Sequence, residues 1–390
     1  MKYLQLSLLR GRLPVALLMA CLVAASVSAA ENLEPESSDV ATLPAGAAHR
    51  VFVMGGPFAG GANVVDADSP ELKILGLVPA KFGMLLTNVD ASRIFVAESF
   101  YAHDNRGKRE DVISIYDGRT LNLLREVAIP GRLIIVPKPH VFDVDLEGEF
   151  GYVYDMVPAS RVHVVDLQKG AVLASVDLPG CALALPFGSL GFATICGDGT
   201  VGAVNVSTTG TTSIKYSKPF FDANEDPLFE SGVIDKASGE AWFLTFSGKI
   251  FPAKLGATAR IGKPWALTEA AGLPAAGTGV QELAWRPGAF GQVMALNTHS
   301  KRLFVLMHPG NFWTHKANGT EVWVIDTGQK RVVRRIPLEQ AGRSISVSED
   351  DASLVYVSGA DGDFTIFDGN TGEKLRSRKL PAGMATVAGQ

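Results

Sequence analysis

A pattern of short β-rich runs repeats along this chain and constrains its fold more than any other feature. Each repeat has an apolar run that typically ends in Asp or Asn, then a turn, then a second run that ends near Pro. The first runs are Asn63–Asp66, Ile113–Asp117, Val162–Asp166, Val201–Asn205, Lys249–Lys254, Val322–Asp326 and Phe364–Asp368. The fourth and fifth runs match the pattern more weakly than the other five do.

A second pattern precedes the repeats, in which a polar turn leads into a short apolar strand. Examples are Ser92–Val96, Gly148–Val153, Glu240–Leu244, Lys301–Leu306 and Ala352–Val357. Each unit therefore holds about four strands, and no long amphipathic helix is evident. Four-stranded units at a nearly regular period are typical of a β-propeller, because radial stacking covers both faces of every sheet.

The seven repeats predict an all-β, seven-bladed β-propeller that occupies residues 49–390. A β-helix or two stacked β-sandwiches is the alternative architecture. The interval between Lys254 and Asp326 is 72 residues, longer than the others, and indicates an insertion near Glu269–Arg286 that forms a helix or a loop.

The first thirty residues have the pattern of an export signal. Basic residues precede an almost wholly apolar stretch, Leu13–Val27, and small residues before Ala30 offer a cleavage site. We therefore predict a signal peptide over 1–30 and an N-terminal arm or linker over 31–48. A membrane anchor is one alternative, although the stretch is short for a span, and Cys21 leaves a lipoprotein signal open.

Two of the three cysteines, Cys181 and Cys196, remain after removal of that signal. Cysteines in exported chains are commonly paired, and the residues between these two are typical of two strands joined by a turn. We predict a disulfide that ties neighbouring strands. A redox or metal-binding pair is the alternative, although neither further thiols nor nearby histidines accompany them.

The charge balance does not indicate a nucleic-acid partner. The chain has 36 Lys and Arg against 40 Asp and Glu, for a formal net charge of −4. No run of five or more Lys or Arg residues occurs either, so the sequence does not suggest a nucleic-acid binder.

Sequence motifs for catalysis and metal binding are scarce. Gly55–Gly61 lacks the Gly-Lys-Ser/Thr of a phosphate loop, and Gly188–Gly191 lacks the Gly-x-Ser-x-Gly pattern. Asp368–Glu373 fits a hairpin turn better than a calcium loop. His308 and His315 flank an aromatic loop, either as a structural pair or as a ligand or metal site.

Several segments resemble the large (heavy) subunit of the quinoprotein amine dehydrogenases, the family of methylamine dehydrogenase and aromatic amine dehydrogenase. The similarity covers nearly the whole mature chain. The segments that carry it are Asn105–Asp117, Thr194–Thr200, Trp285–Gly288, Leu306–Gly310, Thr314–Lys316 and Thr371–Ser377. Cys181 and Cys196 also fall where this family has a disulfide.

The resemblance implies a periplasmic protein of two large and two small subunits, with the large subunit a seven-bladed propeller. It implies that the cofactor, tryptophan tryptophylquinone, is made from two tryptophans of the Cys-rich small subunit. This chain would then supply no catalytic, cofactor-binding or metal-binding residue. The assembled enzyme would convert a primary amine to an aldehyde and ammonia, and pass electrons to a blue copper protein or a cytochrome c.

The resemblance assigns one residue of this chain to the substrate channel. Phe58 matches a Phe near the N-terminus of the family's large subunit that lines the channel at the subunit contact. The glycines around Phe58 depart from the family pattern. Ordinary packing within a blade is the alternative role.

Two other functions stay open at this stage. The chain can be a stand-alone exported propeller that binds a ligand or protein, or a self-contained propeller enzyme. The substrate is also open, because Trp285–Gly288 resembles the methylamine type whereas Thr194–Gly199 and Met307–Gly310 resemble the aromatic type.

Overall fold

The computed structural model describes residues 42–44, 49–55, 60–80, 83–134, 138–380 and 383–387. The chain divides into two units, Met1–Ala41 and Thr42–Gln390, and every described residue belongs to the second. The predicted signal peptide and its cleavage site lie outside the described residues, as does most of the predicted arm. Leu43 of that arm is buried, and its N–H donates to the carbonyl of Arg119 at 2.8 Å.

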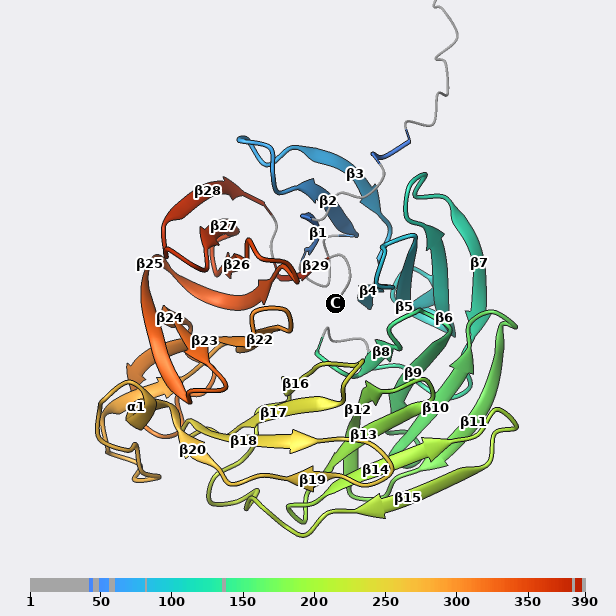
Figure 1. Ribbon diagram of the computed structural model, residues 1–390. Helices are drawn as coiled ribbons and strands as arrows, with labels where there is room; N and C mark the ends of the chain where they lie inside the picture. The colour runs from blue at the N-terminus through green and yellow to red at the C-terminus, as the bar shows by residue number, and fades with distance from the viewer. Residues whose placement is uncertain are drawn as a thin grey trace, which may run out of the picture. The chain divides into compact units, whose positions relative to one another are not determined.

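The second unit is built from antiparallel sheets arranged around a common centre (Figure 1). The first sheet contains β29 (Met384–Val387), β1 (Arg50–Met54), β2 (Ala62–Asp66) and β3 (Ile74–Val78). The second contains β4 (Met84–Thr87), β5 (Arg93–His103), β6 (Arg106–Asp117) and β7 (Leu123–Ala128). The third contains β8 (Phe142–Val144), β9 (Phe150–Asp155), β10 (Arg161–Asp166) and β11 (Ala171–Asp177).

The remaining sheets follow in chain order. The fourth contains β12 (Cys181–Phe187), β13 (Gly191–Cys196), β14 (Val201–Val206) and β15 (Thr212–Tyr216). The fifth contains β16 (Val233–Ile234), β17 (Glu240–Leu244), β18 (Lys249–Lys254), β19 (Arg260–Ile261) and β20 (Trp265–Ala266). The sixth contains β21 (Ala284–Pro287), β22 (Met294–Asn297), β23 (Arg302–Gly310), β24 (Gly319–Asp326), β25 (Arg331–Val347), β26 (Leu354–Gly359), β27 (Asp363–Asp368) and β28 (Lys374–Lys379).

The β-propeller architecture agrees with the sequence prediction, but the predicted seven separate blades are wrong. Five sheets have the size of a propeller blade, with four or five strands each, whereas β21 to β28 form one eight-stranded sheet. The reason is β25, a strand of 17 residues that pairs with β24 through its first part and with β26 through its last part. The repeats mark apolar runs, and they do not show where backbone pairing continues from one run to the next.

The ring closes through the two ends of the second unit. β29, the last strand, pairs with β1, the first strand, from Val51 opposite Val387 to Met54 opposite Met384. One buried cluster accordingly joins residues of the first sheet, such as Val53, to residues of the sixth. The pairing covers the edge of β1 that would otherwise be unpaired, which fits the way propellers protect their sheet edges.

The Asp that ends the first run of most repeats stabilises the turn that follows it. Asp117 Oδ1 accepts hydrogen bonds from the backbone N–H groups of Arg119 at 3.0 Å and Thr120 at 2.9 Å. Equivalent bonds are made by Asp66, Asp166, Asp326 and Asp368. An Asp side chain that caps its own turn is a common way to join two strands, and this explains why the repeat is visible in the sequence.

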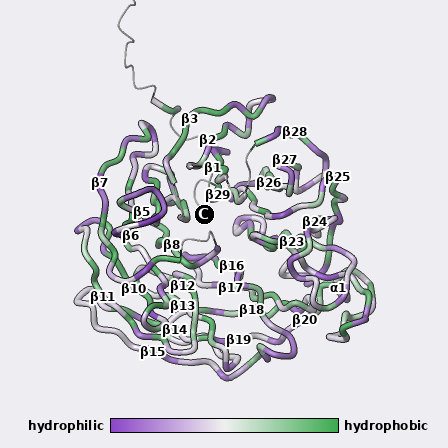
Figure 2. The backbone as a smooth tube through the Cα atoms, turned by 180° about the vertical axis from the view of Figure 1, so that it is seen from behind, coloured by the Kyte–Doolittle hydropathy of each residue, from purple (hydrophilic) through white to green (hydrophobic). Residues whose placement is uncertain are grey.

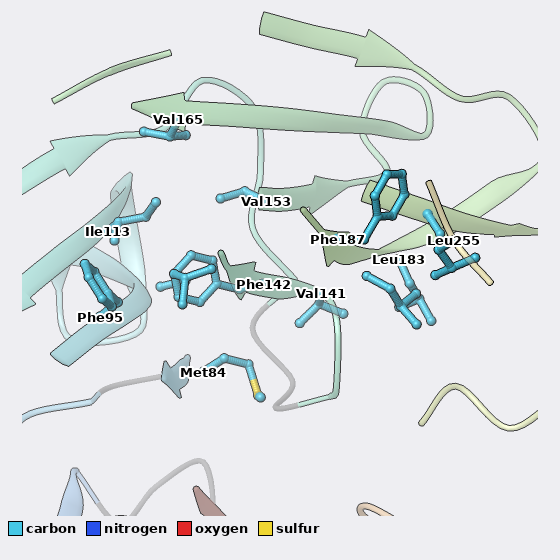
Figure 3. Packing of buried hydrophobic residues seen from close by; sticks show 14 of the residues in the cluster. Met84, Phe95, Ile113, Val141, Phe142, Val153, Val165, Leu183, Phe187 and Leu255 are labelled. Carbon is cyan, nitrogen blue, oxygen red and sulfur yellow. The ribbon is translucent and has the colours of Figure 1, made fainter. Parts of the chain in front are cut away.

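Neighbouring sheets pack face to face, so their middle strands are buried on both sides. Figure 3 shows such packing by Phe95 of β5, Ile113 of β6, Phe142 of β8, Val153 of β9 and Val165 of β10. The outermost strands β7 and β28 are mostly exposed. Hydrophobic and hydrophilic stretches accordingly alternate along the chain (Figure 2), as expected when inner strands face other sheets and outer strands face water.

Cys181 and Cys196 form the predicted disulfide. They lie directly opposite each other on β12 and β13, with their Cα atoms 3.9 Å apart. The predicted insertion near Glu269–Arg286 contains the end of a one-turn helix, α1 (Leu267–Ala270), and a long connection to β21. Within the described part of the chain, no helix has the length and apolar character to cross a bilayer.

Candidate functional site

One end of the sheets carries most of the features that indicate function. The antiparallel order places the turns between second and third strands, and the connections from one sheet to the next, at the same end. We call this end the connection face. Its described residues are 55, 60–61, 79–80, 83, 100–109, 129–134, 138–141, 156–160, 178–180, 197–200, 217–232, 245–248, 271–283, 311–318, 360–362, 380 and 383.

The connection face exposes large apolar side chains. They are Phe100, Met156, Val157, Val280, Leu283 and Trp313, with exposed fractions from 39% to 74%. Most of the other exposed large apolar residues lie on outer strands. Exposed apolar groups gathered at one end of a propeller indicate a protein interface, because water solvates such surfaces poorly.

Most segments that carry the family resemblance meet at this face. Asn105–Asp117 begins in the β5–β6 turn, and Thr194–Thr200 spans the β13–β14 turn. Trp285–Gly288 includes most of β21, which pairs with the Leu306–Gly310 part of β23, so that Arg286 lies opposite His308. Thr314–Lys316 lies in the turn after β23. Only Thr371–Ser377 begins at the opposite end, in the β27–β28 turn.

Arg286 joins two pieces of the connection face. Its side chain is fully buried, with an exposed fraction of 1% for the residue. Nε donates to the backbone carbonyl of Gly310 at 3.1 Å, Nη1 to that of Gly277 at 2.9 Å and Nη2 to that of Glu282 at 3.2 Å. The guanidinium also lies 5.4 Å from the ring centroid of Phe312. One residue of β21 therefore fixes both the 271–283 connection and the start of the β23–β24 turn.

Two glycines permit the close packing around His308. A Cβ at Gly288 would lie 2.5 Å from His308 Cδ2, and one at Gly310 would lie 2.5 Å from His308 Cε1. Any larger residue at either place would push the ring away. Burial lowers the pKa of His308 below its usual value, so the imidazole is neutral at pH 7.

Aromatic rings next to Arg286 form a platform, which consists of Phe229, Phe246, Phe312, Trp313 and His315. The rings of Phe246 and His315 stack with centroids 4.0 Å apart, and Trp313 stands at 90° to Phe246 at 6.2 Å. Trp313 is 49% exposed. Burial, together with the charge of Lys316, lowers the pKa of His315. The platform is therefore an uncharged aromatic surface at neutral pH.

Arg109 holds the β5–β6 hairpin against the next connection. Its Nη2 donates to Asp111 Oδ1 and to the carbonyl of Leu133, both at 2.6 Å, and to Ser99 Oγ at 3.0 Å. Ser99 also bonds Asp111. The hairpin has eleven residues in β5 and twelve in β6, so this network positions a projecting element that the resemblance singled out.

The remaining predicted sites have different outcomes. His308 and His315 both lie at the connection face, but no group of three or more potential metal ligands occurs among the residues with described positions. Phe58 falls between β1 and β2 in the sequence and lies outside the described residues. Asp368 makes the hairpin turn expected for it.

The sequence analysis missed Arg286, Arg109 and the aromatic platform as functional groups. Arg286 lies within the family-like segment Trp285–Gly288, but Arg is rarely buried, so the segment did not indicate a buried cation. The platform has no local signal, because Phe229, Phe246 and His315 are far apart in sequence and meet only through the packing of two sheets.

Comparisons with known proteins identify relatives of the whole second unit. The family model for the methylamine dehydrogenase heavy chain matches residues 47–387. The methylamine dehydrogenase heavy chain of Methylophilus methylotrophus is 28% identical over 353 residues, which cover 89% of this chain and 84% of the relative. That of Methylorubrum extorquens is 28% identical over 403 residues, with 95% of both chains covered.

Solved structures support the fold alone. A protein of unknown function from Desulfotomaculum acetoxidans superposes with a TM-score of 0.62 at 9% identity, covering 87% of this chain and 99% of the other. A Swd1 β-propeller domain from Myceliophteria thermophila gives a TM-score of 0.51 at 10% identity, covering 82% and 95%.

Proposed function

This chain belongs to the methylamine dehydrogenase heavy chain family, and from that premise we propose how it works as the large subunit of a periplasmic amine dehydrogenase. In this proposal the assembly contains two large and two small subunits. The tryptophan tryptophylquinone of the small subunit supplies the oxidising chemistry that converts a primary amine to an aldehyde and ammonia. Electrons then pass to a blue copper protein or a cytochrome c.

The observation that carries the proposal is the composition of the connection face. Exposed apolar side chains and five of the six family-like segments gather at that end of the sheets. A rigid apolar face of this kind suits an obligate partner, because such interfaces are large and resemble a protein core. We propose that the small subunit docks there.

Docking at the connection face would make a dry cavity at the seam between the subunits. A reaction centre gains from exclusion of water, because preorganised groups act more strongly in a low-dielectric site. The role of this chain is then to bind the small subunit, to orient it and to exclude water. In this proposal the small subunit holds the quinone, and the described residues of this chain do not.

Phe58 is proposed to line the substrate channel. β1 ends at Met54 and β2 begins at Ala62, and both of these ends lie toward the connection face. Position 58 falls between these two ends in the sequence, and this supports the proposal that Phe58 acts where the small subunit would dock. Its bulk would limit the size of the amine by excluded volume.

Co-expression with a candidate small subunit tests the function. The gene neighbourhood should contain a short, Cys-rich reading frame with two tryptophans suited to form the quinone. We expect the two chains to co-purify with a visible quinone absorption band and to oxidise methylamine or phenylethylamine. This chain purified alone should be inactive toward both amines.

Two results would contradict the proposal. One is amine oxidation by this chain alone, which would make it a self-contained enzyme. The other is a stable, colourless monomer that fails to bind the small subunit, which would favour a stand-alone binding propeller.

A further inference from the structure

A cavity of about 390 Å³, the axial cavity, lies among the innermost strands, and at one end it is lined by Pro139, His140 and Gly232 of the connection face. Side chains from β4, β8, β22 and β29 line it, and the apolar ones include Met84, Leu86, Phe142, Leu296 and Met384. Figure 3 shows Met84 and Phe142, which also belong to a buried hydrophobic cluster. The lining also includes Leu146 and Ala237, which lie in turns between first and second strands, so the cavity reaches the end opposite the connection face.

One wall of the cavity carries a buried charge network. Asp143 Oδ2 lies 2.8 Å from His140 Nδ1, and Asp143 Oδ1 lies 2.9 Å from Lys236 Nζ. The backbone N–H of Val144 also donates to Oδ1, at 2.8 Å. His140 Nε2 lies 2.7 Å from the carbonyl of Gly232. Both oxygens of Asp143 and both ring nitrogens of His140 are therefore occupied within the protein.

Lys236 is the residue in this wall whose ammonium keeps N–H donors for a further hydrogen bond. Its side chain is only 12% exposed, and among the described residues its ammonium has a single partner, Asp143. A lysine ammonium carries three N–H donors, so two remain. Buried donors without acceptors are costly, and these two lie at a cavity that Lys236 itself lines.

Other acidic groups near the cavity are already engaged. Asp145 Oδ1 accepts from the N–H groups of Glu149 and Phe150, and burial raises the pKa of Asp145 to about 6. Asp235 Oδ1 accepts two backbone N–H groups in its turn. Glu349 Oε2 accepts from the backbone N–H and the hydroxyl of Thr298. Lys236 therefore keeps donors for a bound molecule.

We propose that the axial cavity binds a small uncharged molecule with a short apolar body and a carbonyl oxygen that accepts hydrogen bonds from Lys236. The apolar strands would enclose the body, and the ammonium would hold the head. The volume corresponds to about a dozen waters, which fits a ligand of about ten non-hydrogen atoms and lies at the small end of protein ligand sites.

Calorimetric titration of the assembled protein tests this site with three probes of similar size. Phenylacetate and phenylacetamide carry an accepting oxygen, whereas benzyltrimethylammonium carries a cation and no acceptor. We expect phenylacetamide to bind, phenylacetate to bind more weakly because the carboxylates of Asp235 and Glu349 repel its charge, and the cation, which cannot accept hydrogen bonds from Lys236, not to bind. Lys236→Met should weaken the binding at least tenfold, because it removes the donors while keeping a similar chain length.

Lys236→Met also removes the ion pair with Asp143. A second variant therefore tests the cavity without affecting that pair. Leu86→Phe fills the cavity without changing any charge and should also weaken the binding at least tenfold. Leu123→Phe on the exposed strand β7 is the matched control and should bind as the unaltered protein does. Three results would refute the site. None of the probes binds, so that the cavity holds only water; the cation binds as tightly as the other probes; or Lys236→Met leaves the affinity unchanged. None of these readouts depends on amine oxidation.

Discussion

At the scale of single residues, Arg286 shows how one buried cation can organise a surface. Its three carbonyl partners belong to the 271–283 connection and to the end of β23. A guanidinium can serve all three because its donors lie in a fixed planar fork, which a lysine ammonium cannot reproduce. The exposed apolar residues Val280 and Leu283 are therefore held in place by a residue that never reaches the surface.

Arg286→Lys should weaken binding of the small subunit about tenfold and lower the stability of this chain by about 1–3 kcal/mol. The reason is that at least one buried carbonyl loses its donor and the 271–283 connection loosens. Pull-down affinity and denaturant unfolding would measure the two effects. Arg125→Lys is the control, because Arg125 lies on exposed β7 and donates to one carbonyl, that of Gln168. Equal subunit affinity in the Arg286 and Arg125 variants would show that Arg286 does not organise the docking face.

Phe58→Ala should change the preference between small and bulky amines more than it changes stability. The expected result is a relative gain in turnover of phenylethylamine over methylamine, because a smaller side chain widens the proposed channel. The ratio of kcat/KM for the two amines in the reconstituted enzyme is the measurement. An unchanged ratio would remove Phe58 from the channel.

At the scale of elements, His49 links three segments where the ring closes. It directly precedes β1, and its Nδ1 lies 2.7 Å from Asp68 Oδ1 in the β2–β3 turn. Its Nε2 lies 2.7 Å from Asp350 Oδ2 in the β25–β26 turn. Burial acts to lower the pKa of His49, but hydrogen bonds and charge from the two carboxylates outweigh it, so the pKa is raised above 6.5.

This raised pKa predicts a pH-dependent contribution to stability. A group whose pKa is higher in the folded chain than in the unfolded chain binds its proton more tightly when folded. Its contribution is complete below about pH 6.5 and is lost as the pH rises through the folded value. Thermal unfolding between pH 5 and 9 should show His49→Gln lowering Tm by about 1–3 °C at acidic pH and less at alkaline pH. A Tm difference that does not vary with pH would contradict this role.

At the scale of the whole molecule, β29 connects the end of the second unit to its beginning. Its four residues pair with β1, and Thr386 Oγ1 donates to the carbonyl of Leu85 at 2.9 Å. Met384 and Val387 are buried. The first sheet therefore depends on a strand that is more than 300 residues away in the sequence from its partner.

Ending the chain at Leu380 should destabilise it by more than about 4 kcal/mol, because it leaves the inner edge of β1 unpaired and removes buried apolar side chains. Chemical denaturation, or the loss of soluble protein, would measure the effect. Ending the chain at Val387 removes three residues but keeps β29 and serves as the control. Equal stability of the two truncated chains would show that ring closure contributes little.

The sequence by itself determined the β-propeller class, the disulfide and the family, because each depends on local patterns. An apolar run that ends in a self-capping Asp, two cysteines placed to oppose each other on adjacent strands, and family-like segments are all visible without coordinates. Only the tertiary structure decided the rest. The continuous pairing of β25, the role of Arg286 and the assembly of the aromatic platform and the axial cavity arise from contacts between residues far apart in the chain, and no local pattern encodes which distant residues meet.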